Sequence, residues 1–122
     1  TIAEHIVKHL LPAAAAAGRP APRIIGGYPI VLTKDVAVAR AVIGKTLEIY
    51  GQLPSYRAML DREGYGGPAD LALVGDEATL RREIGRIRDS GVTDFNAAIS
   101  DTDAGAFART FEFLAAVKGE FA

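Results

Sequence analysis

The stretch Arg23-Ile24-Ile25-Gly26-Gly27-Tyr28-Pro29-Ile30-Val31-Leu32-Thr33 contains the strongest strand signal in this chain. Apolar residues occupy both odd and even positions, which is typical of a strand covered on both faces in a parallel sheet. Pro29 lacks the N–H that a ladder would use, and Gly26-Gly27 weakens pairing. We therefore expect a strand over residues 23–33, with a bulge or one open side near its middle.

Helical patterns flank this strand on both sides. Apolar residues spaced by three and four from Ile2 to Leu11 predict a helix that ends or kinks at Pro12, and a second helix is expected in the alanine tract before Gly18. Downstream, Asp35 and Asp76 each precede an amphipathic pattern, so both are predicted to cap helices. A further helix is expected from Pro54 to Leu60.

A second strand is predicted over residues 92–99, followed by a final helix. In that helix Phe107, Phe111, Leu114, Val117 and Phe121 align at helical spacing, and we expect them on one apolar face. Leu71-Ala72-Leu73-Val74 is too short to show a period. A strand and a helical turn both remain open there, and we favour the turn.

Strands separated by long helical stretches must run parallel through crossover connections. The chain, taken as one segment over residues 1–122, is therefore expected to be α/β and helix-rich, with about two parallel strands. Two such strands leave unpaired edges and uncovered faces. We expect obligate association, either with a second copy as a homo-oligomer or with a remaining segment of a larger sheet.

Composition narrows the possible partners and locations. Fourteen basic and fifteen acidic residues give a net charge of −1, with no basic stripe for nucleic acid. No apolar run reaches the ~20 residues that cross a bilayer, and no export signal begins the chain, so no membrane partner and a cytoplasmic location are expected. The first residue is Thr1 and not Met, so we expect the chain to start at a processing or cleavage boundary. The absence of cysteine excludes disulfides and thiolate metal sites.

Three stretches, in this order along the chain, carry a resemblance to a known family. They are Gly51-Gln52-Leu53-Pro54-Ser55-Tyr56-Arg57-Ala58-Met59-Leu60-Asp61-Arg62-Glu63-Gly64, then Pro68-Ala69-Asp70-Leu71-Ala72-Leu73-Val74-Gly75-Asp76-Glu77, and Gly91-Val92-Thr93-Asp94-Phe95. The chain resembles the C-terminal portion of an F420-dependent luciferase-like monooxygenase. The resemblance implies a (β/α)8 TIM barrel of roughly 250 residues or more, of which this would be about the last two-fifths. It also implies an oxidoreductase in which coenzyme F420, or FMN in relatives, exchanges hydride with an organic substrate.

In a barrel, sites gather at the C-terminal ends of strands, which directs attention to Thr33 and Ser100 as parts of a substrate-pocket wall. Both also precede predicted helices, where hydroxyl groups serve as caps, and capping is the favoured interpretation. Asp101 and Asp103 place negative charge where a phosphate would sit, so a phosphate site is disfavoured. The resemblance transfers no catalytic residue and no cofactor-binding residue to this chain.

Other candidate groups favour structural interpretations. His5 and His9 have the spacing of two metal ligands on a helix, but no third ligand is evident, so no metal site is predicted. Asp94 lies in a strand expected to be buried and needs a donor, such as a backbone amide or an arginine, in a structural role.

Two functions are therefore expected as alternatives. In the first, the chain is a fragment of an F420- or flavin-dependent oxidoreductase, and the isolated chain is inactive. In the second, it is a non-enzymatic βα module that self-associates or completes another subunit and has no cofactor site. The sequence leaves open the substrate and the choice between F420 and FMN.

Overall fold

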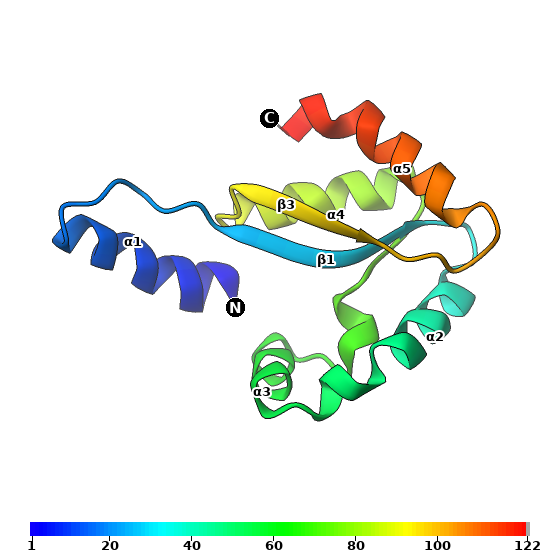
Figure 1. Ribbon diagram of the computed structural model, residues 1–122, viewed down its shortest axis with the longest axis horizontal. Helices are drawn as coiled ribbons and strands as arrows, with labels where there is room; N and C mark the ends of the chain where they lie inside the picture. The colour runs from blue at the N-terminus through cyan, green and yellow to red at the C-terminus, as the bar shows by residue number, and fades with distance from the viewer. Residues whose placement is uncertain (122) are drawn as a thin grey trace.

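A three-stranded parallel sheet organises the computed structural model, which describes residues 1–121 (Figure 1). Its strands are β1 (Ile25–Leu32), β2 (Leu73–Gly75) and β3 (Asp94–Ile99), in the order β2-β1-β3. Both pairings are parallel, with Ile30 aligned with Leu73 on one side and with Ile99 on the other. The α/β class and the two predicted strands are confirmed.

β2 corrects the preference for a helical turn. Leu73, Val74 and Gly75 are all buried and pair with the last three residues of β1. The preceding turn, Pro68–Leu71, is a short 3-10 helix. Three residues are too few to reveal a strand period, so pairing with β1 decides the conformation.

Helices make up most of the remaining chain. The α-helices are α1 (Lys8–Ala16), α2 (Val36–Thr46), α3 (Pro54–Glu63), α4 (Glu77–Asp89) and α5 (Ala106–Val117); a π-helical turn, η1 (Ile2–Val7), precedes α1, and the 3-10 turns η2 (Glu48–Gln52) and η4 (Lys118–Phe121) follow α2 and α5. The predicted caps are confirmed, because Asp35 accepts a hydrogen bond from the Val38 N–H and Asp76 accepts one from the Thr79 N–H.

The helices cover both faces of the sheet. α2 packs against Val31 and Val74, whereas α4 and α5 pack against Ile30 and Leu73 on the opposite face. Figure 1 shows α2 below the strands and α5 above them. The chain moves from β1 out to β2 and then back past β1 to β3. Because parallel crossovers are right-handed, this reversal carries the connecting helices to opposite faces.

The strand order is that of a doubly wound sheet. Consecutive strands of a (β/α)8 barrel are neighbours in chain order, which would put β2 in the middle. Here β1 is central, and its C-terminal half is the best covered part of the sheet, with Ile30 and Val31 both fully buried. Ile25, at the start of β1, is 67% exposed, so one face of the sheet's N-terminal half is open.

Pro29 fits the edge on which β1 is unpaired. β2 begins only opposite Ile30, so β1 lacks a neighbour on that side over its first residues. Thr33, which has the same parity as Pro29, donates its N–H to Gly75 on the β2 side. The missing Pro29 N–H therefore faces the open side, and the expected one-sided strand is observed without a bulge.

Two predicted helix features differ from the structure. The sequence predicts an end or a kink at Pro12 and a second helix in the alanine tract, but a single helix continues through Pro12 to Ala16. Pro12 removes only the bond to the carbonyl of Lys8, the first residue of α1. In α5 and η4, the predicted face is correct in part: Val117 is buried and Leu114 and Phe121 pack against the core, but Phe107 and Phe111 are exposed. The buried face of α5 consists of Ala106, Thr110, Phe113 and Val117. The predicted face and the buried face of α5 both have helical spacing. The face that packs on the sheet is the one that begins with the small residues Ala106 and Thr110.

α1 stands clear of the sheet at one end of the molecule, as Figure 1 shows, and none of its residues is buried. Over residues 1–121, every helix is too short or too polar to traverse a bilayer.

Candidate functional site

The C-terminal edge of the sheet is the first place to examine, because ligands of open α/β sheets bind outside the carboxyl ends of the strands. At this edge a cavity of about 480 Å³ is lined by residues of three loops. Its polar lining comprises Thr33, Lys34, Asp35, Asp76, Glu77, Asp103 and Arg109.

The two predicted wall residues lie at this edge but in different cavities. Thr33 lines the 480 Å³ cavity, and its hydroxyl oxygen accepts a hydrogen bond from the Asp35 N–H at 3.1 Å. Ser100 lines a separate cavity of about 340 Å³ together with Val42 and Thr46 of α2. The Ser100 N–H donates to the Ile30 carbonyl at 2.9 Å. Thr33 thus stabilises the turn before α2, whereas Asp35 makes the helix cap.

Carboxylates occupy the positions where an anion would bind at this edge. Asp35 and Asp76 cap the N-termini of α2 and α4. Hydrogen bonds from Thr79, first from its backbone N–H and then from its side chain, lower the pKa of Asp76. Asp103 has a lowered pKa chiefly because Arg109 donates to it. The edge is therefore unfavourable for a phosphate group.

Arg109 and Thr110 close the space between β1 and β3 beyond the end of β3. The Leu32 carbonyl accepts a hydrogen bond from the Arg109 Nε at 2.6 Å, and the Leu32 N–H donates to the Thr110 hydroxyl at 3.0 Å. Arg109 also contacts Asp103 with both terminal nitrogens. The sequence pattern did not predict a role for Arg109 or Thr110, although the helical spacing of Ala106, Thr110 and Phe113 indicates a second buried face of the helix.

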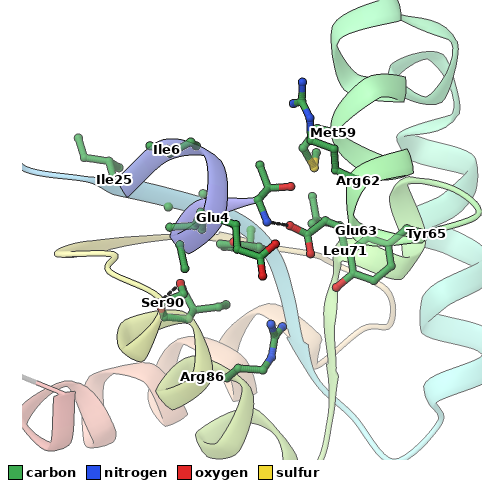
Figure 2. Close-up of a pocket in the computed structure, with 17 residues that line it drawn as sticks. Glu4, Ile6, Ile25, Met59, Arg62, Glu63, Tyr65, Leu71, Arg86 and Ser90 are labelled. Atoms are coloured by element: carbon green, nitrogen blue, oxygen red, sulfur yellow. Dashed lines mark hydrogen bonds and ion pairs between the residues drawn. The ribbon is translucent and has the colours of Figure 1, made fainter. Parts of the chain in front are cut away.

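Figure 2 shows a second cleft, of about 410 Å³, near the N-terminal half of β1. Arg86 of α4 and Ser90, which follows this helix, lie on one side of it and Glu63 and Tyr65 on the other, with Glu4 between them. Glu63 accepts a hydrogen bond from the amino group of Thr1, which lowers its pKa. Two acidic and two basic side chains, Glu4, Glu63, Arg62 and Arg86, line this cleft, so its charge favours neither a cation nor an anion.

A third, mostly apolar pocket of about 220 Å³ lies between the open face of the sheet and α3. Gly27, Pro29 and Ala98 of the sheet line it, and Tyr50 and Tyr56 line its other side with ring centroids 5.0 Å apart. This pocket continues the apolar surface that begins at Ile25.

The two histidines and Asp94 have structural surroundings. The rings of His5 and His9 are 5.5 Å apart, and within residues 1–121 no group of three or more His, Cys, Asp or Glu side chains has metal-binding geometry. Asp94 pairs with Arg23 through two hydrogen bonds, of 3.0 and 2.5 Å, and also accepts one from Thr93. The predicted arginine donor for Asp94 is confirmed.

Comparison with known proteins yields no match to any family model, any curated protein or any solved structure.

Proposed function

We propose that this chain is the C-terminal portion of a (β/α)8-barrel oxidoreductase of the F420-dependent luciferase-like monooxygenase class. In this proposal the enzyme acts in the cytoplasm on a small organic substrate, and F420 or FMN supplies the hydride chemistry. The sequence resemblance supports the family. The parallel α/β class is shared with a barrel, but the strand order β2-β1-β3 is not that of three consecutive barrel strands.

The observation that carries the proposal is the incompleteness of the sheet. Among residues 1–121, β3 has a neighbouring strand on one side only, and β1 is unpaired over its first residues on the β2 side. One face is uncovered where Ile25, Gly27 and Ala98 are exposed. Parallel sheets are stable when both faces are covered, so further strands or a partner must complete this one.

In the proposed enzyme, this chain contributes a wall of the substrate pocket and no catalytic residue. Thr33 and Ser100 line cavities at the C-terminal edge, where barrel enzymes hold their ligands. The carboxylates of Asp35, Asp76 and Asp103 do not fit the phosphate of either cofactor. The phosphate would have to be held by other strands, and this edge would contact only the substrate or the ring.

A second candidate function is a non-enzymatic βα module that self-associates or completes another subunit. The order β2-β1-β3 favours it, because three consecutive barrel strands would follow chain order. Under this alternative, the residues at the C-terminal edge serve as caps and turn contacts only.

Titration of the purified chain into F420 or FMN, followed by fluorescence anisotropy, separates the two functions. Micromolar binding that is lost in Thr33→Tyr but kept in Gln52→Tyr, which adds the same ring on an exposed turn, would support the oxidoreductase proposal. Absence of binding up to millimolar chain would favour the module.

A further inference from the structure

We propose that two copies of this chain associate through their β3 strands, which pair antiparallel about a two-fold axis at Ala97 to form one continuous sheet. The inference rests on the second candidate function, the self-associating module, because in a barrel the free edge of β3 would pair with another strand of the barrel. It names the surface that carries the self-association. A second copy is the occupant because the edge is complementary to itself, as the register below shows.

On the side away from β1, the backbone N–H and C=O groups of β3 pair with no other strand in the described part of the chain. Ser100 donates to Ile30 and Asp94 donates to Ile24, so the even-numbered residues direct their backbone groups toward β1. Neighbouring residues of a strand direct theirs to opposite sides. Phe95, Ala97 and Ile99 therefore point their N–H and C=O groups away from the sheet, along an edge with no neighbouring strand among residues 1–121.

Only one symmetric register uses all three outward residues. With the axis at Ala97, that residue pairs with its own copy, and Phe95 pairs with Ile99 of the second copy. Each pair can exchange both N–H···O bonds, as hydrogen-bonded positions of an antiparallel ladder do. An axis at Phe95 or Ile99 would leave some of these groups unpaired.

The side chains in this register are compatible. Phe95 lies opposite Ile99, an aromatic and β-branched pair that stabilises sheets. Asp94 lies opposite Ser100, and Asp101 opposite Thr93, so each carboxylate faces a hydroxyl group and no like charges oppose each other. An edge strand usually carries charges that block such pairing, but the outward residues of β3 carry none.

α5 adds an apolar surface on the same side. Phe107 and Phe111 are 54% and 57% exposed, with stacked rings 6.2 Å apart. Phe113 contacts Arg81 of α4, and at 3.6 residues per turn the two exposed rings lie about 120 to 160° around α5 from Phe113. They therefore face away from α4, on the β3 side. In the dimer the two α5 helices would lie roughly 10 to 14 Å apart, a gap that these rings can fill.

Light scattering after size-exclusion chromatography tests the association. We expect a dimer at micromolar concentration. Ala97→Pro removes a donor that β1 does not use, and Phe111→Asp places a charge in the aromatic surface, so each should weaken dimerisation at least tenfold. Ala116→Asp, an exposed change on the opposite side of α5, should leave it unchanged. Circular dichroism checks that each variant is folded.

Cross-linking tests the register, because the chain contains no cysteine. In Ala97→Cys, the two thiols would face each other across the axis at a Cα separation of about 5.5 Å, and mild oxidation should give a covalent dimer. Ala116→Cys should form no covalent dimer under the same oxidation. A monomeric wild type would overturn both this inference and the self-association part of the second candidate function. A dimer insensitive to Phe111→Asp and not cross-linked at position 97 would overturn this inference alone.

Discussion

The Thr110 hydroxyl accepts a hydrogen bond from the Leu32 N–H at 3.0 Å, so a helix side chain completes the backbone of β1 where β3 has already ended. Thr110 is fully buried. Thr110→Val keeps the shape but leaves a buried donor unsatisfied, which should cost about 1 to 3 kcal/mol of unfolding free energy in urea titration.

Hydrogen exchange at Leu32 separates the lost bond from changes in packing. Thr110→Ser retains the hydroxyl and loses a methyl group, so the Leu32 amide should stay protected. In Thr110→Val its exchange should accelerate. Equal protection of Leu32 in both variants would mean that the hydroxyl does not hold this strand end.

The ion pair of Arg23 and Asp94 predicts a pH dependence of stability. Hydrogen bonds from Arg23, and then from Thr93, lower the pKa of Asp94 from 3.8 to about 2. Because the folded pKa lies below the unfolded one, the pair stabilises the fold above about pH 4, and this contribution is lost as the pH falls to about 2.

Asp94→Asn should therefore show a smaller fall in unfolding free energy than wild type between about pH 5 and about pH 2. Arg23→Gln should have the same effect, since it removes the donor that lowers the pKa of Asp94. If the unfolding free energy of all three proteins fell equally with pH, the Arg23–Asp94 ion pair would not be the cause of the pH dependence.

Gly75 ends β2 with φ of 156°, and a Cβ there would lie 2.8 Å from Thr79 Cγ2. Gly75→Ala should destabilise the fold by about 1 to 3 kcal/mol, as strained backbone positions do. The comparison is Gly119→Ala, where an added Cβ meets no atom within 4 Å. Thermal unfolding of the two variants compares their stabilities. Equal melting temperatures would contradict the expected strain at Gly75.

Leu80 of α4 is fully buried against the sheet, whereas Leu10 of α1 is 44% exposed. Leu80→Ala should cost about 2 to 5 kcal/mol, as cavities in a core do. Leu10→Ala should change the unfolding free energy by no more than about 0.5 kcal/mol, because α1 stands outside the core. Urea unfolding measures the loss of unfolding free energy in each variant. Equal losses would mean that α1 is as much a part of the core as α4.

Helix caps and strands whose conformation depends on neighbouring residues could be predicted from the sequence. The caps Asp35 and Asp76 and the long apolar run of β1 were predicted, because each depends on contacts or composition within a few residues. β2 was not predicted as a strand, since its three residues take their conformation from pairing with β1.

The buried face of α5 and the cavities at the C-terminal edge of the sheet depend on residues that are far apart in the sequence. Two stripes of α5 share a helical period, and only the position of Leu32, 78 residues before Thr110, decides which is buried. Thr33 and Ser100 were correctly expected near strand ends, but their separation into two cavities follows from the position of α2. Such relationships are non-local and leave no pattern in a single sequence.

The central position of β1 has a consequence for biosynthesis. Ile24, at the entrance to β1, bonds Thr93 at a separation of 69 residues, so this strand leaves the ribosome long before β3 exists. Pairings that close such long loops form slowly and leave apolar strands accessible to misassembly in the meantime. The apolar residues of β1 therefore wait for their β3 neighbour until the last quarter of the chain has been translated.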